Sequence, residues 1–565
     1  MKHRLICSLL ATCAASLPIL SQEALKSTEE EYYDFLSLQG LVERPTLGYR
    51  TLSDSEWTLT EEAKTADENV WKNNSLGSKW TVYEPAQKTD NFFTRGIDQS
   101  VKVKVYGPEW YNSYNTAAPY GQNDGALWQG KGYNTSLTAG ARLEAYGLEA
   151  TFKPQLSFSQ NREFDIMPSV TESPYGYFQS GIDAPQRFGD KSFWTYDWGD
   201  SEVRYTWHNL TFGAGFQNPW LGPAWLNPML GSNNATSYPK VDAGLRKTEI
   251  HLPFLGWNLG DIEGRIWLGR LEESDYFDTI ESNNQRLLTA ISASYAPSFI
   301  PGLTVGVNRI FMTKWASHNI KYIGRLFTLS HSNGSQVGTH EDEDQKLSLF
   351  ADCQLPEVGF EVYGELGIDD FTSQERANPF HTAIYTVGVR QNIPIADSIQ
   401  KHTRALRSEL IFEWNNFEMS QDFQMQWPYT GYYSHGAIPQ GYTNNGQILG
   451  AGSGYFGNSQ FLGYKVYHTR GSAMLFFHRH CPDNNYIYNM SVGKALDDKS
   501  DEYRDHYGRF HTYFTIGGEV NFFVTKNLGI TALFAYVPTN FPTYHNNKIR
   551  DILNYTGQLT VKYNF

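Results

Sequence analysis

The chain alternates between apolar and polar positions over most of its length, from about residue 99 onward. Successive side chains of a β-strand point to opposite faces, so this period predicts strands with one apolar and one polar face. In residues 137–145 the apolar face continues, after a turn at Tyr146-Gly147, into residues 148–158. A second pair of alternating segments pivots on His208-Asn209. Both patterns predict β-hairpins with tight turns.

The final segment, Tyr555 to Phe565, has the clearest alternation. One face carries aromatic, aliphatic and glycine residues, and the other face is polar throughout. A terminal amphipathic strand that closes on Phe resembles the C-terminal signal of bacterial outer-membrane β-barrels. We therefore expect Tyr563 and Phe565 to form an assembly signal that the barrel insertion machinery reads. The alternative is the edge strand of a soluble β-sandwich.

The length of the alternating region sets the strand count. A membrane-spanning strand takes about 10 residues, and one end of such a barrel has short turns. Residues 99–565 therefore predict an all-β transmembrane barrel of about 18 antiparallel strands, with 16 to 20 possible. An even number of strands keeps both chain ends on the periplasmic side.

Residues 1–21 are predicted to be a signal peptide. A basic start, Lys2 to Arg4, precedes the short apolar stretch Leu5 to Leu20. This stretch is too short and interrupted to span a bilayer, which takes about 20 apolar residues. Lipidation at Cys13 is a minor alternative. The signal and the barrel together predict the bacterial outer membrane, with its lipid as a partner.

Residues 22–98 differ from the rest of the chain because they are polar, rich in Glu and nearly free of alternation. Ser27 with Glu30, and Ser53 with Glu56, fit the capping box at the start of a helix. Helices this short are not stable alone and need a surface to pack on. We therefore predict a small N-terminal α-helical segment that plugs the periplasmic end of the barrel.

Composition narrows the function further. The 36 Tyr, 34 Phe and 15 Trp suit aromatic girdles at the two membrane interfaces. The net charge of -14 argues against nucleic-acid binding. Two cysteines beyond the signal cannot build a zinc cluster. No nucleophile elbow, zincin or phosphate-loop motif occurs, so we predict no enzyme activity, catalytic residue, cofactor or metal. His478-Arg479-His480 could bind a metal or an anion, but a polar loop or girdle is the simpler interpretation.

Two loop regions combine aromatic rings with neutral amides. Residues 215–239 and 432–454 are rich in Trp, Tyr, Asn and Gly and carry little charge. Ring faces stack on the CH surfaces of sugars, and amides bond to hydroxyl groups. The predicted polysaccharide-binding residues are Trp220, Trp225, Asn233, Asn234, His435, Tyr442 and Asn444. The alternatives are girdle tryptophans and plain Asn-Gly turns.

Several blocks resemble the Wzi-type capsule assembly family and follow one another in the family order. They are EYYDFLSLQGLVERP from Glu31, NDGALWQGKGYN from Asn123, GFQNPWLGP to LGSNNA over Gly215–Ala235, HLPFLG from His251, EVYGELGIDDF from Glu361, NPFHTAIYTVGVR from Asn378 and SHGAIPQGYTNNGQILG from Ser434. Phe216 and Ser434 stand where the family pattern leads us to expect Arg, which weighs against recognition of acidic sugars there.

The resemblance implies an outer-membrane barrel with a helical bundle at its periplasmic end. It implies a lectin-like role, in which the barrel holds capsular or other surface polysaccharide at the cell surface, without enzymatic activity or cofactor. The alternative function is a porin for sugars or small polar solutes. Glu361, Glu365 and Asp369 share the inward face of one strand, and they either create a cation-selective field or pair with lumen arginines.

Overall fold

The computed structural model describes residues 27–565 except 55, 75–78, 93, 167–172, 177–181, 329–342, 370–382, 396–404, 419–430, 455–456, 483–511 and 542–549. The predicted signal peptide, residues 1–21, and Cys13 within it lie outside the described residues. None of the helices in the described part is long and apolar enough to cross a membrane.

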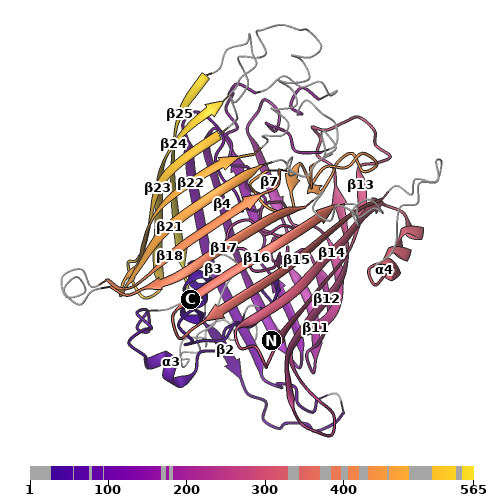
Figure 1. Ribbon diagram of the computed structural model, residues 1–565, viewed down its shortest axis with the longest axis vertical. Helices are drawn as coiled ribbons and strands as arrows, with labels where there is room; N and C mark the ends of the chain where they lie inside the picture. The colour runs from indigo at the N-terminus through magenta and orange to yellow at the C-terminus, as the bar shows by residue number, and fades with distance from the viewer. Residues whose placement is uncertain are drawn as a thin grey trace, which may run out of the picture.

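The strands close into a single antiparallel barrel (Figure 1). Two positions in the wall hold two short strands in line, β5 with β6 and β7 with β8, and the wall therefore has 18 strands, which confirms the predicted number. The wall strands are β3 (Val101–Asn115), β4 (Gly132–Ala145), β5 (Leu148–Phe152), β6 (Gln155–Ser159), β7 (Phe193–Asp197), β8 (Glu202–Trp207), β9 (Leu210–Gly215), β11 (Lys240–His251), β12 (Asn258–Glu272), β13 (Gln285–Pro297), β14 (Leu303–Lys314), β15 (Glu343–Leu355), β16 (Phe360–Asp369), β17 (Ile384–Ile393), β18 (Ala405–Asn416), β21 (Asn458–His468), β22 (Gly471–Cys481), β23 (Thr512–Phe523), β24 (Leu528–Phe541) and β25 (Arg550–Tyr563).

Apolar side chains cover the outer face of the wall and polar side chains fill the inner face. In β25, Leu559 is 44% exposed, whereas the side chain of Thr556 is fully buried in the lumen. A closed wall leaves no unpaired strand edge, and an outward apolar band meets lipid, so this is a barrel of the outer-membrane type. The alternation in the sequence is thus the alternation between lipid and lumen.

The predicted C-terminal strand closes the barrel. β25 pairs with β24 on one side and with β3 on the other, in a register from Thr556 opposite Asn115 to Lys562 opposite Glu109. The rings of Tyr563 and Phe565 lie 5.1 Å apart on the outer face. The terminal strand is therefore the seam of the wall, which excludes the sandwich alternative.

The two ends of the barrel differ in their connections. Both residues of the turns Tyr146-Gly147 and His208-Asn209 have positive φ, as the tightest hairpin turns require, which confirms the two predicted hairpins. These turns and the C-terminus lie at the end that carries β2 (Trp80–Tyr83) and the helix α3 (Glu61–Thr65) (Figure 1). The other end carries the long loops. Short turns mark the periplasmic end of outer-membrane barrels.

The N-terminal segment begins with the helix α2, Thr28–Ser37. Ser27 caps it and its side chain accepts a hydrogen bond from the amide of Glu30, as the first capping box predicts. The second capping box is wrong, because the next helix, α3, starts later and is capped by Thr60. Ser53 instead bonds to Thr51 through their hydroxyl groups, in an irregular stretch that carries the neighbouring Asp54 into the lumen.

Helix α2 is held by charges on the inner face of the wall. Lys562 of β25 lies 2.9 Å from Glu29, and Lys465 of β21 lies 2.5 Å from Glu31. Asp34 pairs with Arg390 of β17. The rings of Phe35 and Tyr467 stack at 4.4 Å beside these ion pairs. The helix thus fills the lumen at the periplasmic end through acids that match cations from three wall strands.

Charges on the outer face of β25 are expected to block assembly. Replacing Tyr563 and Phe565 together with Asp places two carboxylates against the membrane, where Asp costs less than the about 2–4 kcal/mol of Arg or Lys at the midplane, and removes the aromatic residues of the signal. We expect the double variant to be missing from the outer membrane in an assay of heat-modifiable barrel. Lys526→Asp, in the exposed turn before β24, is the control and should assemble. Normal assembly of the double variant would refute the role of this strand as a signal.

Neutralising α2 is expected to open the periplasmic end. Glu29→Gln with Glu31→Gln and Asp34→Asn removes one partner from each ion pair, and breaking a buried pair in this way costs about 3–5 kcal/mol. We expect larger single-channel conductance in planar bilayers than for the unaltered protein. Glu61→Gln with Glu62→Gln removes exposed acids of α3 and should change nothing. Unchanged conductance of the triple variant would mean that α2 does not limit ion flow.

Candidate functional site

The loop between β9 and β11 turns into the lumen instead of projecting outward. Its short strand β10 (Trp220–Leu221) pairs with β1 (Tyr49–Arg50) of the N-terminal segment. Segments from the two ends of the barrel therefore meet inside it, and Arg50 lies over the ring of Trp220 at 5.5 Å. Trp220 is fully buried at this contact.

A carboxylate of the wall fixes the next part of this loop. Glu413 of β18 accepts hydrogen bonds from the backbone amides of Trp225, Leu226 and Asn227, at 2.7 to 3.0 Å. Glu263 of β12 binds the N-terminal segment in the same way, through the amides of residues 47, 48 and 49. Hydrogen bonds to a charged acceptor are the strong ones, so each acid pins a segment without regular structure.

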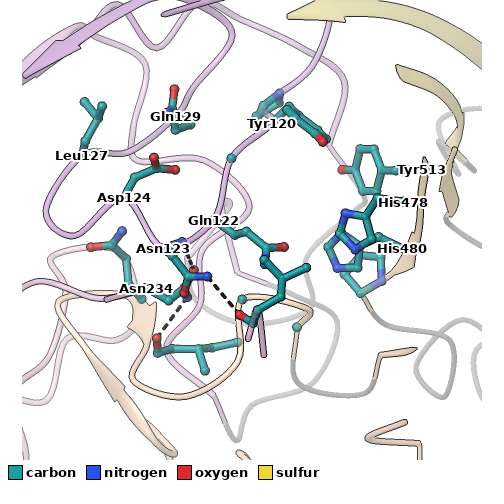
Figure 2. Close-up of a pocket in the computed structure, with 18 of the residues that line it drawn as sticks. Tyr120, Gln122, Asn123, Asp124, Leu127, Gln129, Asn234, His478, His480 and Tyr513 are labelled. Atoms are coloured by element: carbon teal, nitrogen blue, oxygen red, sulfur yellow. Dashed lines mark hydrogen bonds between the residues drawn. The ribbon is translucent and has the colours of Figure 1, made fainter. Parts of the chain in front are cut away.

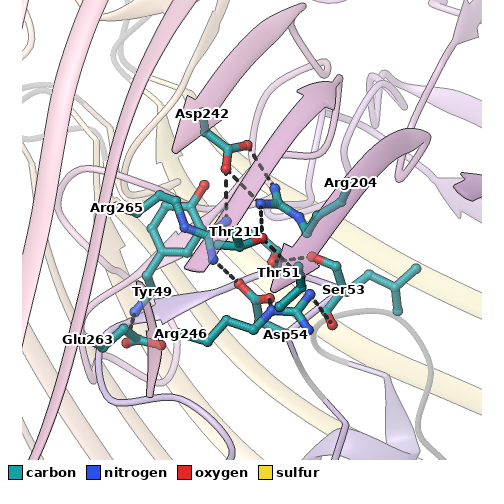
Figure 3. A network of polar contacts seen from close by, with 12 residues as sticks. Tyr49, Thr51, Ser53, Asp54, Arg204, Thr211, Asp242, Arg246, Glu263 and Arg265 are labelled. Carbon is teal, nitrogen blue, oxygen red and sulfur yellow. Dashed lines mark hydrogen bonds and ion pairs between the residues drawn. The ribbon is translucent and has the colours of Figure 1, made fainter. Parts of the chain in front are cut away.

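Asp54 and Asp242 join the N-terminal segment to the wall in one network of ion pairs (Figure 3). Asp54 lies 2.5 Å from Arg265 and 2.7 Å from Arg246. Asp242 lies 2.7 Å from Arg204 and 2.9 Å from Arg265. Burial alone would raise the pKa of Asp54, but Arg265 and Arg246 bring it below its usual value. The network stays charged at neutral pH.

The three inward acids of β16 also have partners. Glu361 pairs with Arg44 at 2.6 Å, Glu365 accepts from the amide of Met229 at 3.1 Å, and Asp369 lies 3.1 Å from Lys346. All three side chains are buried. They therefore hold the lumen contents in place. Glu361 has an arginine partner, as the pairing alternative expects, whereas Glu365 binds a backbone amide and Asp369 a lysine.

A cavity of about 540 Å³ opens among the loops at the opposite end of the lumen from the short turns. Loops 116–131, 222–239 and 446–454 form one side of it, and the inner face of the wall from β21 to β25 forms the other. In Figure 2, Asn123, Asp124 and Asn234 lie opposite His478, His480 and Tyr513, with Gln122 between them. The cavity reaches down to Glu31 of helix α2.

Hydrogen bonds between the loops shape this cavity. Asn234 accepts from the amide of Asn123 at 3.2 Å and donates to the carbonyl of Ile448 at 3.0 Å. Asn123 in turn donates to the carbonyl of Leu226 at 3.0 Å, and Gln447 donates to that of Gly125 at 3.2 Å. Three loops that are far apart in the sequence thus form one side of the cavity.

Of the predicted binding residues, Trp225 and Asn234 line the cavity. The ring of Trp225 is half-buried and lies 5.0 Å from that of Phe461. Asn233 precedes Asn234, and its carbonyl accepts from the amide of Gly125 at 2.6 Å. These residues belong to the same loop surface.

The other predicted residues lie elsewhere. Trp220 is 0% exposed, Tyr442 2% and Asn444 1%. Tyr442 donates to the carbonyl of Leu230, and Asn444 bonds to Thr236 and accepts from the amide of Glu272, so their polar groups support the loops. The ring of His435 accepts from the amides of Ala437 and Ile438 in a turn. Sugar contact by these four side chains remains a prediction. Three of them, Trp220, Tyr442 and Asn444, are buried and expose almost no surface to a ligand.

One side of the cavity was not predicted from the sequence. Tyr120, Gln122, Asp124, Trp128 and Gln129 come from the loop between β3 and β4. The signal was present, because this stretch is the NDGALWQGKGYN block and its surroundings, with the same mixture of rings and amides.

The histidine cluster lies on the strand β22, not in a loop. The rings of His478 and His480 are parallel and 5.5 Å apart, and both line the cavity. His480 bonds to the carbonyl of Ser453 at 2.8 Å, and its ring stacks on Tyr513 at 5.6 Å. Within the described chain, no group of three or more His, Cys, Asp or Glu side chains has the arrangement of a metal site.

Asp124 is the carboxyl group that faces the cavity from the loop side. Part of its surface faces the cavity, but protein atoms surround it, and burial raises its pKa from 3.8 to about 7 while Gln129 opposes this rise. Near neutral pH this carboxyl group is therefore partly protonated, among the rings, amides and hydroxyl groups of the cavity.

Comparison with known proteins agrees with this geometry. The profile of the family described as "Capsule assembly protein Wzi" matches residues 112–503. No curated protein matches the sequence. Among solved structures, Wzi of Escherichia coli, described as an outer membrane protein involved in group 1 capsule assembly and a carbohydrate-binding β-barrel, has a TM-score of 0.55 at 10% identity, over 97% of this chain and all of that one. OprB of Pseudomonas putida (TM-score 0.36, 10% identity, 81% and 94% covered) and OccAB2 of Acinetobacter baumannii (0.38, 11%, 84% and 99%) are less similar.

Raising the pH is expected to loosen the loop that contains Asp124. A raised pKa means that the packed loop holds the proton more tightly than the open loop, so packing is most stable at low pH and weakens as the pH rises from about 4 to about 7. Hydrogen exchange of the amides in residues 116–131, corrected for intrinsic rates, should show this loss. Asp124→Asn should remove the pH dependence, and Asp275→Asn, at an exposed acid of another loop, should retain it. Equal protection across this pH range in the unaltered protein would contradict the assignment.

Proposed function

Because the chain belongs to the capsule assembly protein Wzi family, we propose that it binds a capsular or other surface polysaccharide at the mouth of its barrel. The cavity between the loops carries this proposal. It combines the half-buried ring of Trp225 and the ring of Trp128 with the amides of Gln122 and Asn234. Aromatic faces and neutral hydrogen-bonding groups are the chemistry that recognises a sugar.

The size of the cavity supports binding of a short stretch of the polymer. About 540 Å³ falls within the roughly 300–1,000 Å³ that ligand pockets occupy. Neutral hydrogen bonds contribute only about 0.5–1.5 kcal/mol each. Retention of a polysaccharide at the cell surface therefore depends on many barrels that hold repeats of one chain.

Diffusion of small solutes is the rival function. The plug at the periplasmic end and the inward loop from the other end argue against it, because they meet at β1 and β10 inside the lumen. Small conductance together with glycan retention supports the binding role, and large steady conductance without retention supports the porin. The proposal includes no catalytic step, and its other partners are the outer-membrane lipid and the barrel insertion machinery.

Substitutions of two tryptophans in the same loop distinguish an effect on binding from an effect on folding. Trp225→Ala removes a ring that lines the cavity, and we expect affinity for the surface polysaccharide of the source cell to fall about fivefold per sugar contact, the factor for about 1 kcal/mol. Glycan should move into the medium while the amount of assembled barrel stays unchanged. Glycan that stays bound to cells carrying the Trp225→Ala barrel would rule out the cavity as the binding surface.

Trp220→Ala is the matched comparison in the same loop. It removes a fully buried ring and should lower the free energy of unfolding by about 3–5 kcal/mol. Loss of stability without a specific loss of affinity is the expected result. A thermal midpoint equal to that of the unaltered protein would contradict a structural role for Trp220.

A further inference from the structure

A short helical segment lies on the outer surface of the barrel. After β14 the chain forms the 3₁₀-helix η1 (Ser317–Lys321) and the helix α4 (Tyr322–Arg325), which lies outside the wall beside β14 (Figure 1). We call residues 315–328 the outer flap. Its buried residues Tyr322 and Leu326 pack on Phe311 and, more loosely, on Ile266 and Ile291 of the wall. These wall residues alternate with the lumen residues Trp267, Ala290 and Ile310, so they face outward.

Polar wall residues fasten the flap to this outward face. Arg309 of β14 donates to the carbonyls of Arg325, Leu326 and Thr328, at 2.7 to 3.2 Å. Arg325 of the flap lies 2.6 Å from Glu343 of β15. A charged residue on the lipid side of a barrel is costly without partners. Arg309 and Glu343 are buried here because the flap covers them, and their contacts fix it in place.

An apolar groove runs between the flap and the place where the loop after β9 leaves the wall. Its volume is about 720 Å³. Ala214, Val241 and Leu268 form its floor, Phe216 one side, and Trp315 and Ile320 the other. Phe216 is held by stacking on Trp198 at 5.3 Å. The groove is therefore a hollow with fixed sides in the outward face of the wall.

The segment that borders the groove is basic, although the chain as a whole carries a net charge of -14. Residues 314–328 contain Lys314, His318, Lys321 and Arg325 and no Asp or Glu. Lys321 is exposed and follows Ile320, which lines the groove. Arg270, at the edge of the groove, lies 2.7 Å from Glu272. Trp315, Ile320 and Phe327 are 50%, 49% and 63% exposed beside these cations. Basic residues interleaved with exposed apolar ones are typical of segments that lie at the surface of an anionic membrane.

We propose that this groove binds one phosphorylated glycolipid of the outer leaflet, of the lipid A class. One acyl chain lies on Ala214, Val241 and Leu268, and a phosphate faces the basic residues of the flap. The flap lies towards the end of the barrel with the long loops, so the lipid comes from the outer leaflet. This site is separate from the polysaccharide cavity and does not depend on the proposed function.

The test measures lipid that stays on the full-length protein. Barrels reconstituted in phosphatidylcholine nanodiscs are incubated with purified lipid A, extracted with mild detergent and analysed by native mass spectrometry. We expect one lipid A per barrel. Ala214→Phe fills the floor of the groove and should reduce retention about tenfold, the loss for roughly two buried CH₂ groups. Ala243→Phe is the matched control, because Ala243 also faces outward but lies outside the groove.

Two further arms separate this site from general lipid contact. Lys321→Gln should weaken lipid A retention and leave that of phosphatidylcholine unchanged. Leu268→Trp fills the same floor from another strand and replaces Ala214→Phe if that variant does not give a heat-modifiable barrel. Equal retention by filled and unaltered grooves would overturn the proposal, and so would retention of phosphatidylglycerol as strong as that of lipid A.

Discussion

Compensation of buried charge inside the lumen is the constraint on which the rest of the structure depends. The outer face of the wall meets lipid, so the charged residues of the wall are concentrated on its inner face, and helix α2 and the inward loop then exclude water from them. A buried charge without a partner is strongly unfavourable. Glu263 and Glu413 therefore bind backbone amides, and Asp54 and Asp242 share arginines from several strands. These contacts fix the positions of the segments inside the barrel as firmly as strand pairing fixes the wall.

This constraint explains how the two ends of the molecule differ. At the periplasmic end, acids on one helix meet cations on the wall, which is a direct match of side chains. At the other end, wall carboxylates bind the amides of irregular loops, and the surface of those loops stays neutral. The neutral surface is the one that we assign to sugar, and the basic flap on the outside is the one that we assign to lipid.

The wall could be predicted from sequence and the site only in part. Alternation, turn chemistry and the terminal strand are local, and they predicted the strand number, the hairpins at Tyr146 and His208, and the C-terminal strand. Burial of Trp220, Tyr442 and Asn444 depends on partners far along the chain, such as Thr236 for Asn444, and composition alone cannot distinguish a loop that folds inward from one that projects outward. The capping box at Ser53 failed for the same reason, because Asp54 beside it is drawn to Arg265 and Arg246.

The three amides bound by Glu413 also bear on how weak sugar contacts can suffice. A mobile loop loses conformational entropy when it binds, and each immobilised side chain costs about 0.5–1.5 kcal/mol, as much as a neutral hydrogen bond contributes. The backbone around Trp225 is already fixed by a carboxylate of the wall that does not line the cavity. Most of the ordering has thus taken place during folding, and the site is preorganised for a ligand that offers only small gains at each unit.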